Sequence, residues 1–129
     1  MRIEAYFQQL RENIDSCPIV RSFNVTYDKR GSHEAFIRGE VYFVDGSILH
    51  LREFVDVEIS VDGLTYVYQY MDPAKKLVFR YDNTGHHKKL NLPTHPHRKH
   101  EGSEQNVIAS PAPDLAAVLN EIQILVELP

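Results

Sequence analysis

Apolar residues recur every three or four positions near both ends of the chain. The first stripe comprises Ile3, Tyr6, Phe7, Leu10 and Ile14. The second comprises Leu115, Val118, Leu119, Ile122 and Leu125 or Val126. This spacing predicts two amphipathic helices, one over residues 2–14 and one from Leu115 onward. Pro18 ends the first helix, and Pro113 and Asp114 lie where a helix start favours them.

Between these helices, apolar and polar residues alternate in five runs, which is the period of half-buried β-strands. The runs are Phe23–Tyr27, Ala35–Val44, Ser47–Ser60, Leu64–Met71 and Leu77–Tyr81. The pairs Asp45-Gly46 and Asp62-Gly63 are typical of tight hairpin turns. We therefore expect a single α+β domain over residues 1–129. Its architecture would be a five-stranded antiparallel meander with the N-terminal and C-terminal helices packed on the sheet.

Residues 84–110 lack any convincing period. A structureless stretch of that length in a compact domain is usually functional or disordered, so we expect a functional loop. It contains five of the chain's seven histidines: His86, His87, His95, His97 and His100. Residues 80–100 carry five lysines or arginines against one carboxylate, Asp82, a charge of +4 in a chain of −4. Such a basic segment favours an anionic partner, nucleic acid or phosphate before membrane.

The composition further narrows the class of protein to which the chain can belong. The hydrophobic share of 43% and the charged share of 25% are those of a soluble globular protein. No uncharged apolar run is long enough to span a bilayer, and the N-terminus lacks the apolar core of a secretion signal. A lone Cys17 rules out an internal disulfide and fits a reducing cytoplasm. We expect a cytoplasmic protein with no membrane partner, and a homodimer stays open.

Clustered histidines and arginines meet the needs of metal-independent RNA cleavage. Imidazole exchanges protons near neutral pH, so it can take the 2′-hydroxyl proton or protonate the departing 5′-oxygen while cations stabilise the phosphate. The candidate acids and bases are His87, His97 and His100. The candidate phosphate ligands are Arg80, Lys99 and Arg52. The candidates for further RNA contacts are His86, Lys88, Lys89 and Arg98. A solvated loop whose histidines have no chemical role is the alternative.

The same histidines could instead hold a metal ion. The motif His95-x-His97-x-x-His100 can bring imidazoles together, and His86-His87 could add a fourth ligand. Against this, the segment has no cysteine, and basic neighbours such as Lys88 and Lys89 repel a cation. We therefore rank a metal site below acid–base use and expect no cofactor.

Glu53 interrupts the apolar face of its predicted strand. A carboxylate in that position is costly unless it is paired. One interpretation places it near a strand end or in an ion pair with an arginine such as Arg38 or Arg80. The other makes it a buried carboxylate that orients a catalytic histidine.

Three tyrosines, Tyr66, Tyr68 and Tyr70, share one face of a predicted strand. Packing in a half-buried sheet is the default role for such rings. An open aromatic face beside a basic loop could instead stack RNA bases, which makes Tyr68 and Tyr70 candidates for RNA contact. Tyr81, next to Arg80, is the tyrosine best placed for an active-site role.

Many of these residues occur in a pattern that resembles the TumE family, small toxins of prokaryotic toxin–antitoxin pairs. The resemblance runs from about Phe43 to His100. The motifs that carry it are Arg52-Glu53-Phe54, Thr65–Met71, Arg80-Tyr81-Asp82-Asn83, His86-His87 and Leu92–His100. Residues that match the family pattern are Glu53, Arg80, His97, Lys99 and His100. Residues that depart from it, and are therefore not expected to be indispensable, are Phe54, Gln69, His95 and Arg98.

The resemblance implies a toxin role and a cognate antitoxin, usually a small helix-turn-helix protein. Many small α+β toxins cut mRNA without metal, so we expect a metal-independent endoribonuclease that uses histidine acid–base chemistry. The catalytic candidates are then Glu53, Arg80, Tyr81, His87, His97, Lys99 and His100. A non-catalytic module that binds nucleic acid or a partner protein is the first alternative, and a His-ligated metal-dependent enzyme is the second.

Overall fold

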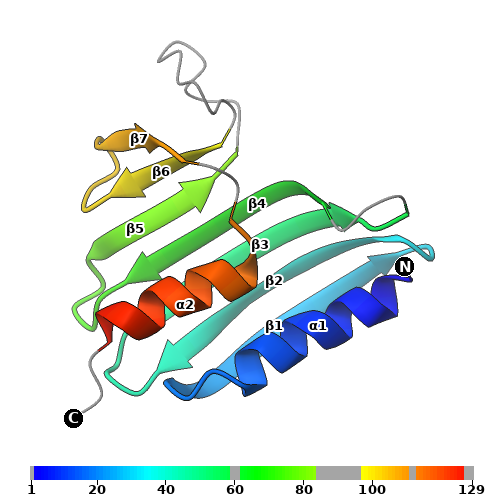
Figure 1. Ribbon diagram of the computed structural model, residues 1–129, viewed down its shortest axis with the longest axis horizontal. Helices are drawn as coiled ribbons and strands as arrows, with labels where there is room; N and C mark the ends of the chain where they lie inside the picture. The colour runs from blue at the N-terminus through cyan, green and yellow to red at the C-terminus, as the bar shows by residue number, and fades with distance from the viewer. Residues whose placement is uncertain (1, 59–61, 84–96, 111–112, 127–129) are drawn as a thin grey trace.

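The computed structural model describes residues 2–58, 62–83, 97–110 and 113–126. Within these ranges, the chain forms two helices and seven strands (Figure 1). In chain order they are α1 (Ile3–Asp15), β1 (Val20–Arg30), β2 (Glu34–Phe43), β3 (Ile48–Asp56), β4 (Asp62–Met71), β5 (Leu77–Asp82), β6 (Arg98–Glu101), β7 (Val107–Ala109) and α2 (Leu115–Leu125). The α+β class and both predicted helices are confirmed.

All seven strands belong to one antiparallel sheet, in the spatial order β1 to β7. The predicted meander is therefore correct, but the predicted number of five strands is wrong. The two additional strands, β6 and β7, lie within the segment that was expected to be a loop. In β6 the alternation is between charged side chains rather than between apolar and polar ones, so no period of two is visible in the sequence.

The hairpin expected at Asp62-Gly63 is also displaced. Asp62 pairs with Asp56 and Gly63 with Val55, so both residues belong to β4 instead of to a turn. By contrast, Gly46 has a φ of +90° in the connection between β2 and β3, as the Asp45-Gly46 turn requires.

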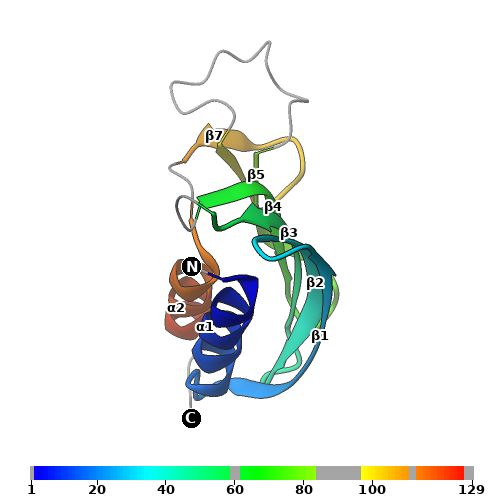
Figure 2. The ribbon, with the colours of Figure 1, turned by 90° about the vertical axis from the view of Figure 1, so that its right-hand side faces the viewer.

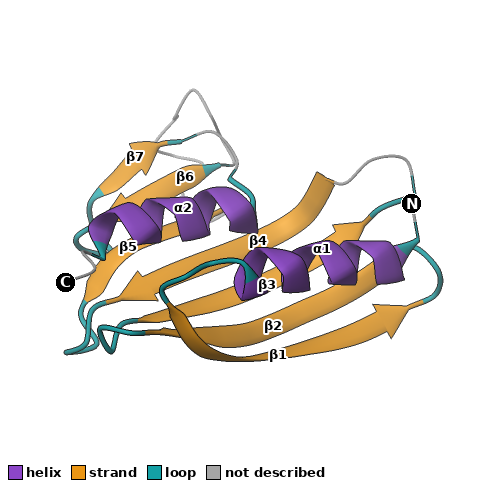
Figure 3. Cartoon of the chain, turned by 60° about the horizontal axis from the view of Figure 1, so that its bottom comes forward, coloured by secondary structure: helices purple, strands orange, loops and turns teal. Residues whose placement is uncertain are grey.

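Both helices cover the same face of the sheet, which leaves the other face without a helix (Figure 2). The strands contribute buried apolar residues such as Ile37, Val41, Leu49 and Leu51 to this covered side. From α1 come Ile3, Leu10 and Ile14, and from α2 Leu115, Val118, Leu119 and Ile122. Figure 3 shows α1 over the β1–β3 half and α2 over the β4–β5 half. No helix among the described residues is long and apolar enough to cross a membrane.

Two local features help to fix the start of α2 and the pairing of β1 with β2. The side chain of Asp114 accepts a hydrogen bond of 2.8 Å from the backbone N–H of Ala117, so Asp114 is the N-cap of α2. In β2, a Cβ atom on Gly39 would lie 2.4 Å from the carbonyl oxygen of Asn24. Only glycine therefore allows β2 to approach β1 so closely at the middle of this hairpin.

Candidate functional site

Side chains on the sheet face opposite the helices, which we call the open face, fall into three rows that the strand register aligns across the sheet. The aromatic row is Asp28, Phe36, Phe54 and Thr65. The arginine row is Thr26, Arg38, Arg52, Val67, Asp82 and Arg98. The histidine row is Asn24, Glu40, His50, Gln69, Arg80 and His100. The arginine row lies between the other two, because residues 36, 38 and 40 follow each other along one face of β2.

A hollow of about 450 Å³ opens over the middle of the arginine and histidine rows. Strands β1 to β4 line it, with side chains that include Thr26, Arg38, Glu40, His50, Arg52 and Gln69. Most of these side chains are polar or charged. The hollow therefore suits a polar, anionic ligand better than an apolar one.

Arg38 and Arg52 stand directly opposite each other on β2 and β3, and both are exposed. Like charges in this position destabilise a sheet. Among the described residues, neither guanidinium group has a carboxylate within ion-pair distance. An anion bound between them would remove the repulsion, and guanidinium groups bind phosphate in a bidentate manner.

His50 lies beside Glu40 in the same hollow. Its Nδ1 is 3.7 Å from Glu40 Oε1, and its side chain is 41% exposed. The hydroxyl of Tyr42 donates a hydrogen bond to Glu40, and this bond raises the pKa of Tyr42. Tyr42 thus holds the Glu40 carboxylate next to the imidazole, which leaves an accessible proton donor and acceptor side by side.

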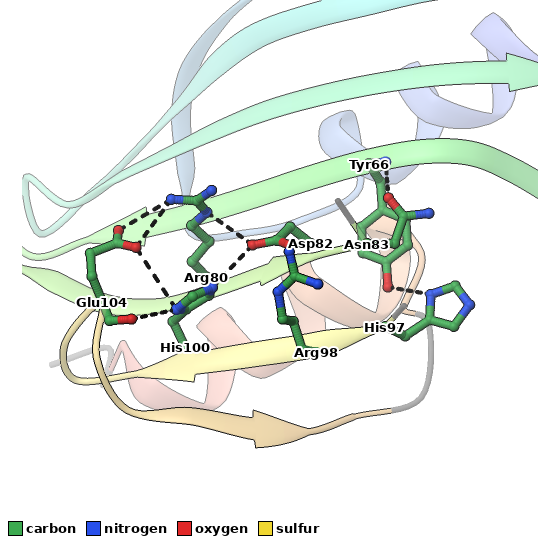
Figure 4. Close-up of polar contacts among 8 residues, drawn as sticks. All are labelled: Tyr66, Arg80, Asp82, Asn83, His97, Arg98, His100 and Glu104. Carbon is green, nitrogen blue, oxygen red and sulfur yellow. Dashed lines mark hydrogen bonds and ion pairs between the residues drawn. The ribbon is translucent and has the colours of Figure 1, made fainter. Parts of the chain in front are cut away.

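At the β5–β6 end of these rows, three cationic or titratable side chains converge on the buried carboxylate of Asp82 (Figure 4). Arg98 Nη2 is 2.7 Å from Asp82 Oδ1. Arg80 Nε and His100 Nε2 are each 3.2 Å from Asp82 Oδ2. The group forms because residues 80 and 82 face the same way on β5 and pair with residues 100 and 98 on β6.

Glu104, in the connection between β6 and β7, completes this group. Its backbone carbonyl lies 2.8 Å from His100 Nδ1, and its carboxylate is 3.2 Å from Arg80 Nη1. Both ring nitrogens of His100 therefore face oxygen atoms, of Glu104 on one side and of Asp82 on the other. His100 is only 2% exposed. In this position the imidazole holds Arg80 and the β6–β7 turn in place and does not reach a substrate on the open face.

Other predicted site residues lie on the opposite, helix-covered face. Tyr81 donates a hydrogen bond of 2.5 Å to Glu121 on α2, and Lys99 Nζ lies 2.8 Å from the other carboxylate oxygen of Glu121. Burial alone would lower the pKa of Lys99, but its bonds to Glu121 and Tyr81 outweigh burial and raise it. These contacts tie α2 to β5 and β6 and separate Tyr81 and Lys99 from the arginines of the open face.

Glu53 is buried beneath the helices. The interpretation that paired it with an arginine such as Arg38 or Arg80 is wrong. Its carboxylate accepts hydrogen bonds from the hydroxyls of Tyr6 on α1 and Tyr68 on β4, the latter at 2.7 Å. Burial raises the pKa of Glu53, and the two hydroxyl donors offset only part of that effect. Arg52, its neighbour in sequence, points to the open face.

The tyrosines of β4 are core residues. Tyr68 and Tyr70 are 3% and 4% exposed, and Tyr70 donates a hydrogen bond of 2.8 Å to Ser47 Oγ. Neither ring offers a free face to a base. Tyr66 stacks on His97, with ring centroids 5.7 Å apart and its hydroxyl 2.9 Å from His97 Nδ1. Figure 4 places His97 and His100 at opposite ends of the group, so these two imidazoles do not converge.

Comparison with protein families gives one match, to the model described as Toxin TumE, over residues 9–126. The chain belongs to the TumE toxin family. The match confirms the resemblance, and it extends beyond Phe43–His100 to include the C-terminal half of α1 and all of α2. No curated protein and no solved structure matched the chain significantly.

Because the TumE family is a family of toxins from toxin–antitoxin pairs, membership implies a cognate antitoxin for this chain. Of the residues predicted for its site, the structure brings Arg80, Arg98 and His100 together and places Arg52 in the adjoining hollow. Four further predicted residues, His86, His87, Lys88 and Lys89, lie outside the described part of the chain, as does His95 of the predicted metal motif. Within the described ranges, no group of three or more histidine, cysteine or acidic side chains is placed to hold a metal ion.

Three residues of this TumE-family chain were not selected as site residues from its sequence, although they line the hollow: Arg38, Glu40 and His50. The signal that finds them is the alternation itself, because it sets all three on the polar side of β2 and β3. His50 does not belong to the histidine cluster in the sequence, and only the strand register places it beside Glu40.

Proposed function

We propose that this TumE-family toxin is a metal-independent endoribonuclease that cuts RNA on the open face of its sheet. The observation that supports this proposal is the combination in one hollow of a half-exposed imidazole beside a carboxylate and two arginines that have no ion-pair partner within the described part of the chain. The arginines would bind the phosphodiester, and the His50–Glu40 pair would move the protons.

The chemistry needs one proton acceptor, one proton donor and positive charge. In the proposed reaction, Glu40 takes the proton of the 2′-hydroxyl and O2′ attacks the phosphorus. The P–O5′ bond then breaks as the imidazolium of His50 protonates O5′. The products are a 2′,3′-cyclic phosphate and a 5′-hydroxyl. Arg38 and Arg52 stabilise the additional negative charge of the transition state.

The strand register favours His50 over His100 as the histidine of the proposed reaction. His50 and His100 lie on the same row, but three strand spacings separate them, roughly 14 Å at about 4.8 Å each. Two groups so far apart cannot serve one phosphodiester as acid and base. Because His100 is buried, we assign it and Asp82 the role of positioning Arg80, which could bind a neighbouring phosphate.

The first prediction concerns His50. Replacing it with asparagine removes the proton donor from an exposed site, so we expect the cleavage rate of a single-stranded RNA to fall by roughly 10²–10⁴-fold. The thermal stability should stay close to that of the wild-type chain. Cleavage is measured by gel electrophoresis of an end-labelled RNA, with and without EDTA.

His33→Asn is the matched control, because His33 lies in the connection between β1 and β2, away from the hollow. It should cleave at the wild-type rate. The endoribonuclease proposal fails if the purified chain leaves RNA intact under all conditions. If chelation abolishes cleavage and elemental analysis finds stoichiometric metal, the metal-dependent alternative replaces it.

We also propose that a helix-turn-helix antitoxin inhibits the toxin. Expression of the chain in bacteria should arrest growth, and co-expression of the antitoxin should restore it. His50→Asn should relieve the arrest without the antitoxin, whereas His33→Asn should not. RNA binding without cleavage by the wild-type chain would favour the non-catalytic alternative.

A further inference from the structure

The aromatic row of the open face contains two adjacent rings that the core does not use. Phe36 and Phe54 lie opposite each other on β2 and β3, with ring centroids 4.5 Å apart and planes inclined by 38°. Phe36 is 43% exposed, and Phe54 is half-buried. The guanidinium carbon of Arg30 lies 5.3 Å from the centre of the Phe36 ring. The fold thus presents an apolar aromatic surface beside cationic side chains.

This surface adjoins Arg38 and Arg52 along the two strands. Phe36 is two residues from Arg38 on β2, and Phe54 is two residues from Arg52 on β3. Same-face neighbours in a strand are about 7 Å apart. The four side chains therefore form an aromatic pair and a cationic pair. The distance between the two pairs is comparable to the distance between the base and the phosphate of one nucleotide.

We infer that this part of the open face binds single-stranded RNA, with a phosphate at Arg38 and Arg52 and the adjoining base stacked on Phe36 and Phe54. The inference rests on the proposed ribonuclease function and adds the conformation of its substrate. A base can stack on a side chain only when it is free of its own helix, so a duplex cannot use the aromatic pair.

The chemistry of the surface favours a nucleotide over a protein. An acidic protein segment would neutralise the arginines but would gain little from a pair of aromatic rings. An apolar segment would cover the rings and leave two guanidinium groups buried without partners, which is costly. A nucleotide satisfies both halves, because every base has an aromatic face and every nucleotide a phosphate.

The test measures binding with a probe that cannot be cleaved. A fluorescent single-stranded oligoribonucleotide with 2′-O-methyl groups has no free 2′-hydroxyl, and its affinity is read from fluorescence anisotropy. Phe36→Leu keeps the apolar contact and removes the aromatic face, so affinity should fall roughly tenfold. Phe36→Trp should keep the wild-type affinity, because it keeps an aromatic face.

A duplex of the same sequence is the second probe, and Phe36→Leu should leave its affinity unchanged. Ile124→Ala removes another exposed apolar side chain, on α2, and is the matched protein control. Thermal unfolding confirms that each variant is folded. The inference is overturned if Phe36→Leu binds the single strand as tightly as the wild type, or if it weakens duplex binding equally.

These results separate the inference from the function on which it rests. If Phe36→Leu weakens single-strand binding while the wild-type chain never cuts unmodified RNA, the base site stands and the ribonuclease proposal falls. If the wild-type chain cuts RNA and Phe36→Leu binds and cuts normally, the ribonuclease proposal stands and the base site falls.

Discussion

Glu53 places a carboxyl group inside the core, where it accepts hydrogen bonds from Tyr6 and Tyr68. Burial raises the pKa of this group above that of an exposed glutamate. The folded chain therefore holds the proton at pH values at which the unfolded chain has released it. Folding stability must then fall as the pH rises from the ordinary glutamate pKa of about 4.3 toward the higher value in the folded state.

We predict that Glu53→Gln removes this dependence. The amide can accept from one tyrosine hydroxyl and donate to the other, and it carries no charge. Relative to the wild type, the variant should gain stability as the pH rises from 4 to 7. The free energy of unfolding is measured by urea denaturation at each pH.

Glu53→Leu is the informative comparison for that variant. It leaves the buried hydroxyl of Tyr68 without this acceptor, so it should be less stable than Glu53→Gln by about 1–3 kcal/mol at every pH. A wild-type chain and a glutamine variant with parallel stability curves would contradict the raised pKa of Glu53.

Alternation along the strand was enough to predict that Glu53 lies on the apolar face, but it was not enough to predict its partners. Tyr6 is 47 residues away in sequence. Its position depends on how α1 packs across the sheet, which no local pattern encodes. The same limit applies to His50. The pattern sets it on the polar face, but only the strand register shows that Glu40 is its neighbour.

Strand β6 shows why the pattern of hydrophobic residues did not predict the last two strands of the sheet. Its buried side chains, Arg98 and His100, lie on the open face and contact the carboxylate of Asp82 instead of an apolar core. A strand held by charge has no apolar period. Helices and strands with apolar faces were located from their pattern, although β1 extends three residues beyond its predicted range at each end and β3 ends four residues before its predicted end. By contrast, β6 and β7 were assigned to a loop.

Asp82→Asn should therefore loosen the sheet at β6. The substitution removes a buried negative charge and leaves Arg98 without that ion-pair partner, which should cost roughly 3–5 kcal/mol. Urea denaturation gives the total loss, and amide hydrogen exchange should show early opening of residues 98–101.

Asp28→Asn is the control for that loss. Asp28 also lies on a strand and pairs with an arginine, Arg30, at 3.0 Å, but both side chains are more than half exposed. Its removal should cost no more than about 1 kcal/mol. Equal losses for the two variants would mean that the buried pair contributes no more than a surface one.

The whole molecule is acidic, with a net charge of −4, so its overall field repels RNA. Binding must then depend on the local arrangement of the arginines on the open face. If Arg38 and Arg52 together neutralise one phosphate, their joint replacement by alanine should make the slope of log affinity against log salt less negative by about 0.7.

Arg2 and Arg11, at the N-terminal helix, allow a charge-matched control. Their joint replacement by alanine changes the net charge by the same amount but should leave the slope unchanged. The slope comes from anisotropy titrations of the single-stranded probe at several salt concentrations. An equal effect of both double variants would show that RNA responds to total charge and not to the open face.

Every strand in the sheet pairs with the one made just before it, so no pairing waits for a distant segment. On the ribosome, β1 to β3 can therefore assemble, and with them Phe36, Arg38 and His50, soon after Asp56 has been added. Helix α2 is translated on the order of several seconds later, at about 5–20 residues per second. The surface that we propose for RNA can therefore form before helix α2 is available to cover the other face of the sheet.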